Sequence, residues 1–160
     1  RELTKDLKNP SEQSWSRLKR YVRYIVSTVA NEEGTFFPRR KVRPVPKVLD
    51  IFTDTDWAGS KVDRKSTYCI VHRLGEYTLA VKVGGVAIHT LSSGETEFYG
   101  GVNGTCEGLL LQHVLAFIGL KTDLVLHLDS SAARGVMARQ GVGAIRHLEV
   151  KTLWLQQLVM

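Results

Sequence analysis

The chain has few of the features that define several common protein classes. Its 160 residues include only two cysteines, Cys69 and Cys106, which form no CxxC pair. The sequence therefore predicts neither a disulfide framework nor a cysteine-rich zinc site. Cys69 falls in a strand-like run and Cys106 on an apolar helix face, so we expect both thiols to be reduced core residues. No apolar run approaches the roughly 20 residues of a membrane span, and the N-terminal residues show no signal-peptide pattern. These absences are typical of an intracellular protein with no membrane partner.

Sequence motifs of other enzyme classes are also missing. Ser92 is not part of a Gly-x-Ser-x-Gly elbow, so acyl transfer is not favoured. The run Gly141-Val142-Gly143 follows a predicted helix and not a strand, which argues against dinucleotide binding. His127 and Asp129 share a face of a predicted strand and, with His147, form an alternative zinc site, but they lack the tight spacing of zinc ligands.

Basic residues are concentrated in the N-terminal third of the chain. Residues 1–47 hold 12 of the 22 Lys and Arg residues and 5 of the 16 acidic residues, a net charge of +7. The rest of the chain has 10 basic and 11 acidic residues, a net charge of −1. This distribution is typical of an arm that holds a polyanion, attached to a body with an acidic centre. The candidate phosphate contacts are Arg17, Lys19, Arg20, Arg23, Arg39, Arg40 and Lys41. The alternative is that the first four form the solvated face of a helix.

Composition and proline positions indicate where the compact domain begins. With 43% hydrophobic and 24% charged residues, the chain is long enough for one globular domain with an appendage. Three of its four prolines, Pro38, Pro44 and Pro46, fall between residues 31 and 47 and interrupt regular structure there. We therefore predict a basic helix and linker over residues 1–47 and a compact domain over residues 48–160.

Hydrophobic periodicity predicts an α/β domain. The expected elements are a helix at 11–29, strands at 48–56, 67–71 and 77–91, a helix at 92–119, a strand at 123–129 and helices at 130–140 and 146–160. The strand run at 77–91 is broken at Gly84-Gly85, which suggests a hairpin or a bulge there. The long helix has an apolar stripe from Phe98 to Phe117 and a second stripe of Gly100, Gly104 and Gly108. Because each glycine in a helix costs roughly 1 kcal/mol relative to alanine, we expect the glycine stripe to lie close against the sheet.

Three acidic residues stand where these elements would bring them together. Asp54 lies near the end of the first strand, Asp129 ends a second apolar strand run, and Glu97 lies early in the long helix. Carboxylates without a thiolate or histidine cluster beside them suit hard divalent cations such as Mg²⁺. The sequence therefore predicts a magnesium-dependent phosphodiesterase.

Five short motifs occur in the order found in one known family. They are TDTDWAG at 53–59, RKST at 64–67, LSSGETEF at 91–98, LDSSA at 128–132 and IRHLE at 145–149. Together they resemble the ribonuclease H domain of copia-type LTR retrotransposon polyproteins. Residues 15–28 resemble the segment that joins such a domain to its reverse transcriptase. The resemblance implies a polyprotein fragment with a ribonuclease H-like mixed sheet, built from three antiparallel strands, a helix, a parallel strand and further helices. It also implies a cytoplasmic particle or the nucleus as the location.

The resemblance assigns roles to individual acidic residues. Asp54 matches the family's first-strand catalytic aspartate, and Asp129 matches the one that ends the fourth strand. Glu95 and Glu97 both lie in the helix motif and point to different sides, so helical phase leaves the choice between them open. The family's catalytic glutamate directly precedes an aromatic residue, as Glu97 precedes Phe98. Glu95 is then expected to be a first-turn acid that interacts with the helix dipole.

The sequence departs from the family's pattern at two places. Gly94 stands where the family has threonine. The family domain also continues beyond residue 160 into another strand and a helix whose aspartate resembles a fourth metal ligand, so we expect a C-terminally truncated domain that cleaves slowly. Glu149 is a candidate replacement for that ligand, with a structural or substrate-contact role as the alternative. His147 is a candidate for orienting a product phosphate or a neighbouring carboxylate, with an ordinary half-buried histidine as the alternative.

The implied activity is cleavage of the RNA strand of an RNA–DNA hybrid. Two Mg²⁺ ions roughly 3.5 to 4 Å apart, for which Mn²⁺ can substitute, would be held by Asp54, Glu97 and Asp129 and would activate water for an in-line displacement. The 2′-hydroxyls of RNA would distinguish it from DNA. Candidate contacts to the hybrid are Ser92, Ser93, Ser130, Ser131 and the backbone of residues 141–143.

Two alternatives remain at this stage. Each of those serines is also explained as a helix cap. The whole domain is also explained as a degenerate module that binds nucleic acid, or scaffolds the reverse transcriptase part of the polyprotein, without cleaving.

Overall fold

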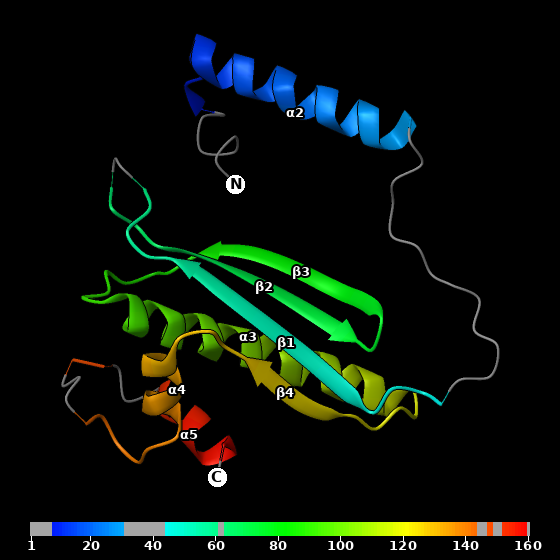
Figure 1. The fold of residues 1–160 in the computed structure, drawn as a ribbon, viewed down its shortest axis with the longest axis vertical. Coiled ribbons are helices and arrows are strands. Elements are labelled where there is room, and N and C mark those ends of the chain that lie inside the picture. Colours follow the sequence, from blue (N-terminus) through cyan, green and yellow to red (C-terminus); the bar gives the residue numbers. More distant parts are fainter. Residues whose placement is uncertain (1–7, 31–43, 61–62, 144–146, 149–151, 160) are drawn as a thin grey trace. The chain divides into compact units, whose positions relative to one another are not determined.

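The computed structural model describes residues 8–30, 44–60, 63–143, 147–148 and 152–159 (Figure 1). The chain divides into two compact units, Arg1–Arg43 and Pro44–Met160. The division falls just before the start of the first strand, which is Val48. Among the helices that the structure describes, none is both long enough and apolar enough to cross a membrane.

The first unit contains one long helix, α2, at Glu12–Ala30. The hydroxyl of Ser11 caps it by accepting a hydrogen bond from the Ser14 N–H at 3.1 Å. The apolar side chains repeat at helical spacing but remain exposed, Trp15 and Val29 among them. The ammonium of Lys19 lies 5.5 Å from the centre of the Trp15 ring. The predicted helix over residues 11–29 is confirmed as an amphipathic helix.

The second unit is built on a four-stranded mixed sheet. The strands are β1 at Val48–Asp56, β2 at Thr67–Leu74, β3 at Tyr77–Gly85 and β4 at Asp123–His127. Their order in the sheet is β3-β2-β1-β4. The β1–β2 and β2–β3 pairs are antiparallel, and β4 pairs with β1 in parallel. The predicted α/β class, with three antiparallel strands followed by a helix and a parallel strand, is confirmed at this level.

The helix α3, at Ser93–Phe117, covers one face of the sheet through its glycine stripe (Figure 1). A Cβ atom added at Gly104 would lie 2.6 Å from the Cγ2 of Thr53, and one added at Gly108 would lie 2.3 Å from the Cδ1 of Ile51. These distances leave no room for a side chain, so glycine is what lets the helix lie on β1. The predicted close approach is confirmed.

Alternation along β1 separates the two faces of the sheet. Leu49, Ile51 and Thr53 are buried under α3, whereas Phe52 and Asp54 are exposed on the other face. Two short helices, α4 at Ser131–Met137 and α5 at Leu155–Leu158, follow β4. They complete a core cluster with the N-terminal half of α3, formed by Phe98, Val102, Ala133, Val136, Met137, Leu148 and Leu155.

Part of the predicted apolar stripe of α3 does not face the core. Phe98 and Val102 are buried, but Cys106, Leu110 and Val114 are exposed. The sheet is contacted by the glycine face, and a helix that approaches so closely through that face turns its neighbouring stripe outward. The prediction that Cys106 is a core residue was therefore wrong, and Cys69 is only half-buried. Neither thiol is in a disulfide.

The predicted C-terminal helix was too long. In the described part of residues 146–160, the only α-helix is α5 at Leu155–Leu158. His147 and Leu148 lie in a turn, where Leu148 is buried in the core and His147 bonds to Glu95. These tertiary contacts override the local helical pattern. The predicted helix at 130–140 and the strands at 123–129 and 77–91 also end earlier, at Met137, His127 and Gly85.

Candidate functional site

The register of the two parallel strands places two aspartates at the same end of the sheet. Phe52 of β1 is the partner of His127 of β4. Asp54 lies two residues beyond Phe52 and on the same face, and Asp129 lies two residues beyond His127, just past the end of β4. Both aspartates are exposed. Neighbouring strands that run in parallel thus deliver one carboxylate each to this end of the sheet.

Glu97 approaches the same place from α3. Its side chain is only 7% exposed. One carboxylate oxygen, Oε1, accepts a hydrogen bond from the N–H of Thr55 at 3.2 Å, which fixes it to the residue that follows Asp54. The other oxygen, Oε2, is buried without a hydrogen-bond partner in the described part of the chain. A buried carboxylate oxygen with nothing to bind is what a cation or a water would satisfy.

The electrostatics of Glu97 connect the three carboxylates. Burial raises the pKa of Glu97 above its usual value, and the negative charges of Asp129 and Asp54 raise the pKa further. Hydrogen bonding from Thr55 opposes these effects. The charges of both aspartates therefore disfavour the ionised form of Glu97 in the absence of a positive charge.

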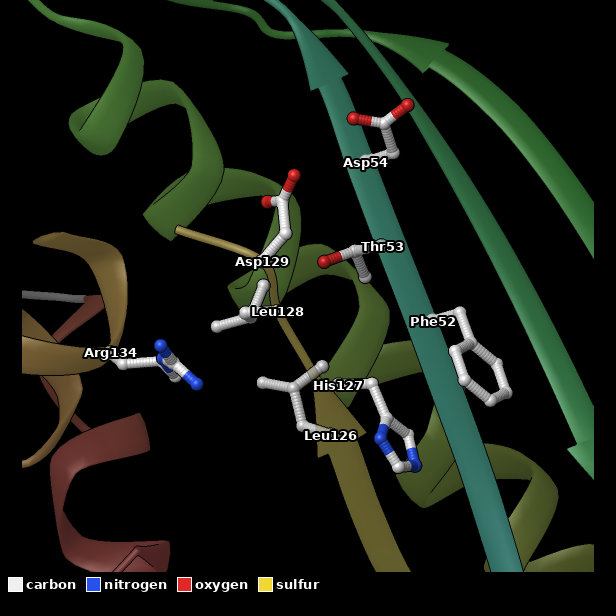
Figure 2. Close-up of a pocket in the computed structure, with 8 residues that line it drawn as sticks. All are labelled: Phe52, Thr53, Asp54, Leu126, His127, Leu128, Asp129 and Arg134. Atoms are coloured by element: carbon white, nitrogen blue, oxygen red, sulfur yellow. The ribbon is translucent and has the colours of Figure 1, made fainter. Parts of the chain in front are cut away.

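A pocket of about 480 Å³ opens beside the two aspartates (Figure 2). Its lining residues are Phe52, Thr53, Asp54, Leu126, His127, Leu128, Asp129 and Arg134. The rings of Phe52 and His127 stack with a centroid separation of 4.4 Å and an interplanar angle of 9°. His127 also bonds to the carboxylate of Asp50 at 2.7 Å. The Phe52 and His127 rings therefore form an aromatic wall of the pocket, which the bond to Asp50 holds in place. Asp54 and Asp129 lie beyond this wall, each two residues further along the chain.

Arg134 lines the same pocket and was not predicted as a site residue. It belongs to α4, and Figure 2 shows its guanidinium reaching in from that helix, on the side of the pocket away from β1. In the sequence it stands among small residues of a short helix, and no motif distinguishes it. Only its position opposite the ends of β1 and β4 connects it with the acidic residues.

Glu95 and His147 form a separate pair. Glu95 is 1% exposed, and its Oε2 accepts hydrogen bonds from the Leu91 N–H at 2.8 Å and from the Nε2 of His147 at 3.0 Å. His147 itself is about half exposed. Of the two glutamates at the start of α3, Glu97 is therefore the one that contacts β1, and Glu95 ties the turn at His147 to the helix.

Two of the predicted substrate-contacting serines are helix caps. Ser92 accepts a hydrogen bond from the Glu95 N–H at 3.2 Å, and Ser130 accepts one from the Ala133 N–H at 3.1 Å. Ser93 and Ser131 are the exposed first residues of α3 and α4. These caps leave the hydroxyl protons of Ser92 and Ser130 free to be donated elsewhere.

The loop at residues 141–143 uses much of its backbone internally. The side-chain amide of Gln156 accepts from the Gly141 N–H at 2.9 Å and donates to the Gly141 carbonyl at 3.0 Å. Arg139 donates to the Val142 carbonyl at 2.8 Å. These three bonds occupy groups that were predicted to contact the hybrid, so that prediction weakens for Gly141 and for the Val142 carbonyl.

The remaining predicted residues lie outside the pocket or outside the described residues. Arg17, Lys19, Arg20 and Arg23 are exposed on α2. Glu149 and the basic run Arg39, Arg40 and Lys41 fall in segments that the structure does not describe. The alternative zinc site has no geometric support, since His127 bonds to Asp50 and His147 to Glu95.

The donor atoms at this end of the sheet suit a hard cation, although the side chains are not grouped around one point where a metal ion could bind. Asp54, Glu97 and Asp129 offer only carboxylate oxygens, which Mg²⁺ prefers. Within the ranges that the structure describes, no three His, Cys, Asp or Glu side chains are grouped so that they could hold a metal ion. Both aspartates are exposed, and their side chains would have to turn toward Glu97 for all three carboxylates to share a cation.

Comparison with known proteins adds no identification. No protein-family model matches the chain, and no solved structure matches it.

Proposed function

We propose that the chain is a metal-dependent endonuclease of the ribonuclease H type, which cleaves the RNA strand of an RNA–DNA hybrid. One observation carries this proposal. Two strand ends and one helix bring Asp54, Asp129 and Glu97 to one end of the sheet, where the charges of both aspartates act on Glu97.

The architecture of the domain supports the proposal. A mixed sheet of order β3-β2-β1-β4, with α3 leading from β3 into a β4 that is parallel to β1, is compatible with a ribonuclease H-like fold. In this arrangement the central strand β1 supplies one acid and the adjacent parallel strand supplies another. The five sequence motifs that resemble copia-type ribonuclease H domains include these same acids.

The chemistry follows from what each side chain does. When bound, Mg²⁺ would polarise the scissile phosphate and lower the pKa of the attacking water. Asp54, Asp129 and Glu97 would hold it with oxygen ligands. The Thr55 N–H keeps one Glu97 oxygen in place, and the burial of Glu97 keeps bulk water away from that side of the site.

The partners follow from the same proposal. The acidic site takes a phosphodiester, and the basic helix α2 and the linker after it supply cations that hold the phosphate backbone of a hybrid. The reverse transcriptase part of the same polyprotein would produce that hybrid within an intracellular particle or the nucleus.

A cleavage assay with a matched pair of aspartate variants tests this function. Asp129→Asn removes a carboxylate from the acidic cluster, whereas Asp123→Asn makes the same change at the other end of β4, where Asp123 is also exposed. We expect Asp129→Asn to abolish Mg²⁺-dependent cleavage of a labelled RNA–DNA hybrid, and Asp123→Asn to keep it. Equal cleavage by the two variants would exclude the acidic cluster as the active site.

The rival function is a module that binds nucleic acid without cleaving it. It is favoured by the observation that no three metal-ligating side chains among the described residues are already grouped for a metal ion. The two functions separate in one experiment, in which the wild-type protein is incubated with the hybrid in Mg²⁺ and in Mn²⁺. Binding without cleavage in either ion would support the module, and cleavage that Asp129→Asn removes would support the nuclease.

A further inference from the structure

Among the described residues, Arg134 has no partner, although it lies in a pocket that also contains two aspartates. It is exposed on α4, and its side chain has no hydrogen bond or ion pair within the described part of the chain. The same pocket contains Asp54 and Asp129, yet Arg134 pairs with neither of them. Figure 2 shows the guanidinium and the carboxylate of Asp54 at different sides of the pocket.

Two other basic side chains, one on the pocket wall and one just beyond α4, already have partners. His127, on the opposite wall, bonds to Asp50 and stacks on Phe52. Arg139, five residues after Arg134, donates to the Val142 carbonyl and so serves the local fold. Arg134 therefore remains available for an anionic ligand.

We propose that Arg134 binds a phosphate of the nucleic-acid strand next to the one that is cleaved. The proposal rests on the proposed function and names a contact of the same site. Asp54 and Asp129 repel the phosphates on either side of the one held at the metal site, and a positive charge across the pocket offsets that repulsion. A guanidinium is permanently charged and presents a planar fork of donors that matches two phosphate oxygens, which makes it well suited to this task.

The shape of the pocket agrees with this assignment. Its volume of about 480 Å³ is in the range of pockets that bind small ligands. The carboxylates lie at the end of the sheet, Arg134 enters from α4, and Phe52 provides an apolar wall between β1 and solvent (Figure 2). A strand with its cleaved phosphate at the aspartates would place a neighbouring phosphate toward Arg134 and a sugar or base against Phe52.

The first test is equilibrium binding of an RNA–DNA hybrid in EDTA, where no metal-dependent cleavage occurs. Arg134→Gln keeps a polar, uncharged side chain in place of the charged one, and Arg134→Lys keeps the charge without the fork. Arg73→Gln is the matched control, because Arg73 is exposed on β2 opposite Asp50 and does not line the pocket. We expect Arg134→Gln to weaken binding roughly ten- to hundredfold, Arg134→Lys to weaken it less, and Arg73→Gln to have little effect.

The second test identifies the phosphate. Single phosphates along each strand are replaced one at a time by neutral methylphosphonates, and each hybrid is measured with the wild-type protein and with Arg134→Gln. At one position the neutral group should weaken binding to the wild-type protein by the same factor as Arg134→Gln, and should have no further effect in that variant. If every methylphosphonate weakens binding to the variant as much as to the wild type, Arg134 contacts no phosphate.

The outcomes separate this inference from the nuclease function. Coupling between Arg134 and one phosphate, combined with no cleavage in Mg²⁺, would keep the Arg134 contact and overturn the nuclease. Normal cleavage and binding by Arg134→Gln would keep the nuclease and overturn the contact. Since Arg134 is exposed, its variants should have the melting temperature of the wild-type protein. If Arg134→Gln instead melts below the temperature of the binding assay, its weaker binding reflects unfolding, and the inference is overturned as well.

Discussion

Replacement of Gly104 by alanine tests how closely α3 lies on β1. The new Cβ would lie 2.6 Å from the Cγ2 of Thr53 and 3.1 Å from the Cγ2 of Ile51. Neither contact is easily relieved, because both partners are β-branched residues of a strand with restricted χ1 rotamers. The helix must therefore move away from the strand, or the strand must bend.

The net effect is the difference between two opposing contributions. Alanine is favoured over glycine in a helix by roughly 1 kcal/mol, whereas overpacking of a tight contact costs about 1 to 3 kcal/mol. We expect Gly104→Ala to lower the free energy of unfolding by about 1 kcal/mol, which corresponds to a fall of roughly 4 °C in Tm for a domain of this size. A control is Gly135→Ala in α4, where an added Cβ meets nothing within 4 Å. There, only the helix preference acts, and we expect a gain of up to about 1 kcal/mol.

Thermal and urea unfolding of four variants test this prediction: Gly104→Ala, Gly135→Ala, Thr53→Ser and the double variant with Gly104→Ala and Thr53→Ser. Thr53→Ser removes the methyl group that the new Cβ would strike, so we expect the Gly104→Ala cost to be smaller in a Thr53→Ser background than in the wild type. If Gly104→Ala stabilises the protein as much as Gly135→Ala does, the close contact between α3 and β1 is wrong. An unchanged cost in the Thr53→Ser background would place the clash elsewhere.

Three further predictions concern the charged groups. Because burial raises the pKa of Glu97, its contribution to stability is full below the ordinary glutamate pKa and is lost as the pH rises through the folded-state pKa. Asp129→Asn removes one charge that repels ionised Glu97. The urea midpoint of this variant should therefore fall less between pH 4 and pH 8 than that of the wild type, and an equal fall would contradict the charge interaction between Asp129 and Glu97. Glu95→Ala leaves the Leu91 N–H without its acceptor and should lower stability by about 1 to 3 kcal/mol, and an unchanged Tm would show that the Glu95 contacts contribute nothing. Deletion of residues 1–46 should weaken hybrid binding and reduce its log–log salt slope by up to about 0.9 for each lost phosphate contact, whereas an unchanged slope would make α2 a solvated or docking helix.

The sequence predicted correctly those helices and strands whose ends depend on a few neighbouring residues. The strand at Val48–Asp56 follows from its apolar run and from the spacing of Asp50, Asp54 and Asp56 along one face, and the start of α3 follows from Ser92, whose hydroxyl caps the helix. The end of α3 follows from Gly119, which has a φ of +87°. The position of Asp54 and Asp129 at the same end of the sheet was predictable as well, because parallel strands end on the same side of a sheet.

The failures share a different cause. The exposed half of the α3 stripe and the short α5 depend on which face of a segment meets the rest of the chain, and local periodicity does not contain that information. Leu148 has the same apolar character in a helix as in a buried turn. Arg134 was missed for the same reason, since a lone arginine in a helix acquires a role only from what lies across the pocket.

Thr55 of β1 lies against the glycine face of α3 and also donates a hydrogen bond to Glu97. A Cβ added at Gly100 would lie 2.6 Å from the Cγ2 of Thr55, so the absence of a side chain there sets how near α3 comes to this part of β1. The N–H of the same threonine donates to Glu97, which lies less than one helical turn before Gly100. One residue of β1 therefore determines both the distance of the helix and the direction of its carboxylate. The glycine stripe thus has a further consequence beyond stability, because it fixes the position of Glu97 relative to Asp54, the residue that precedes Thr55 in the chain.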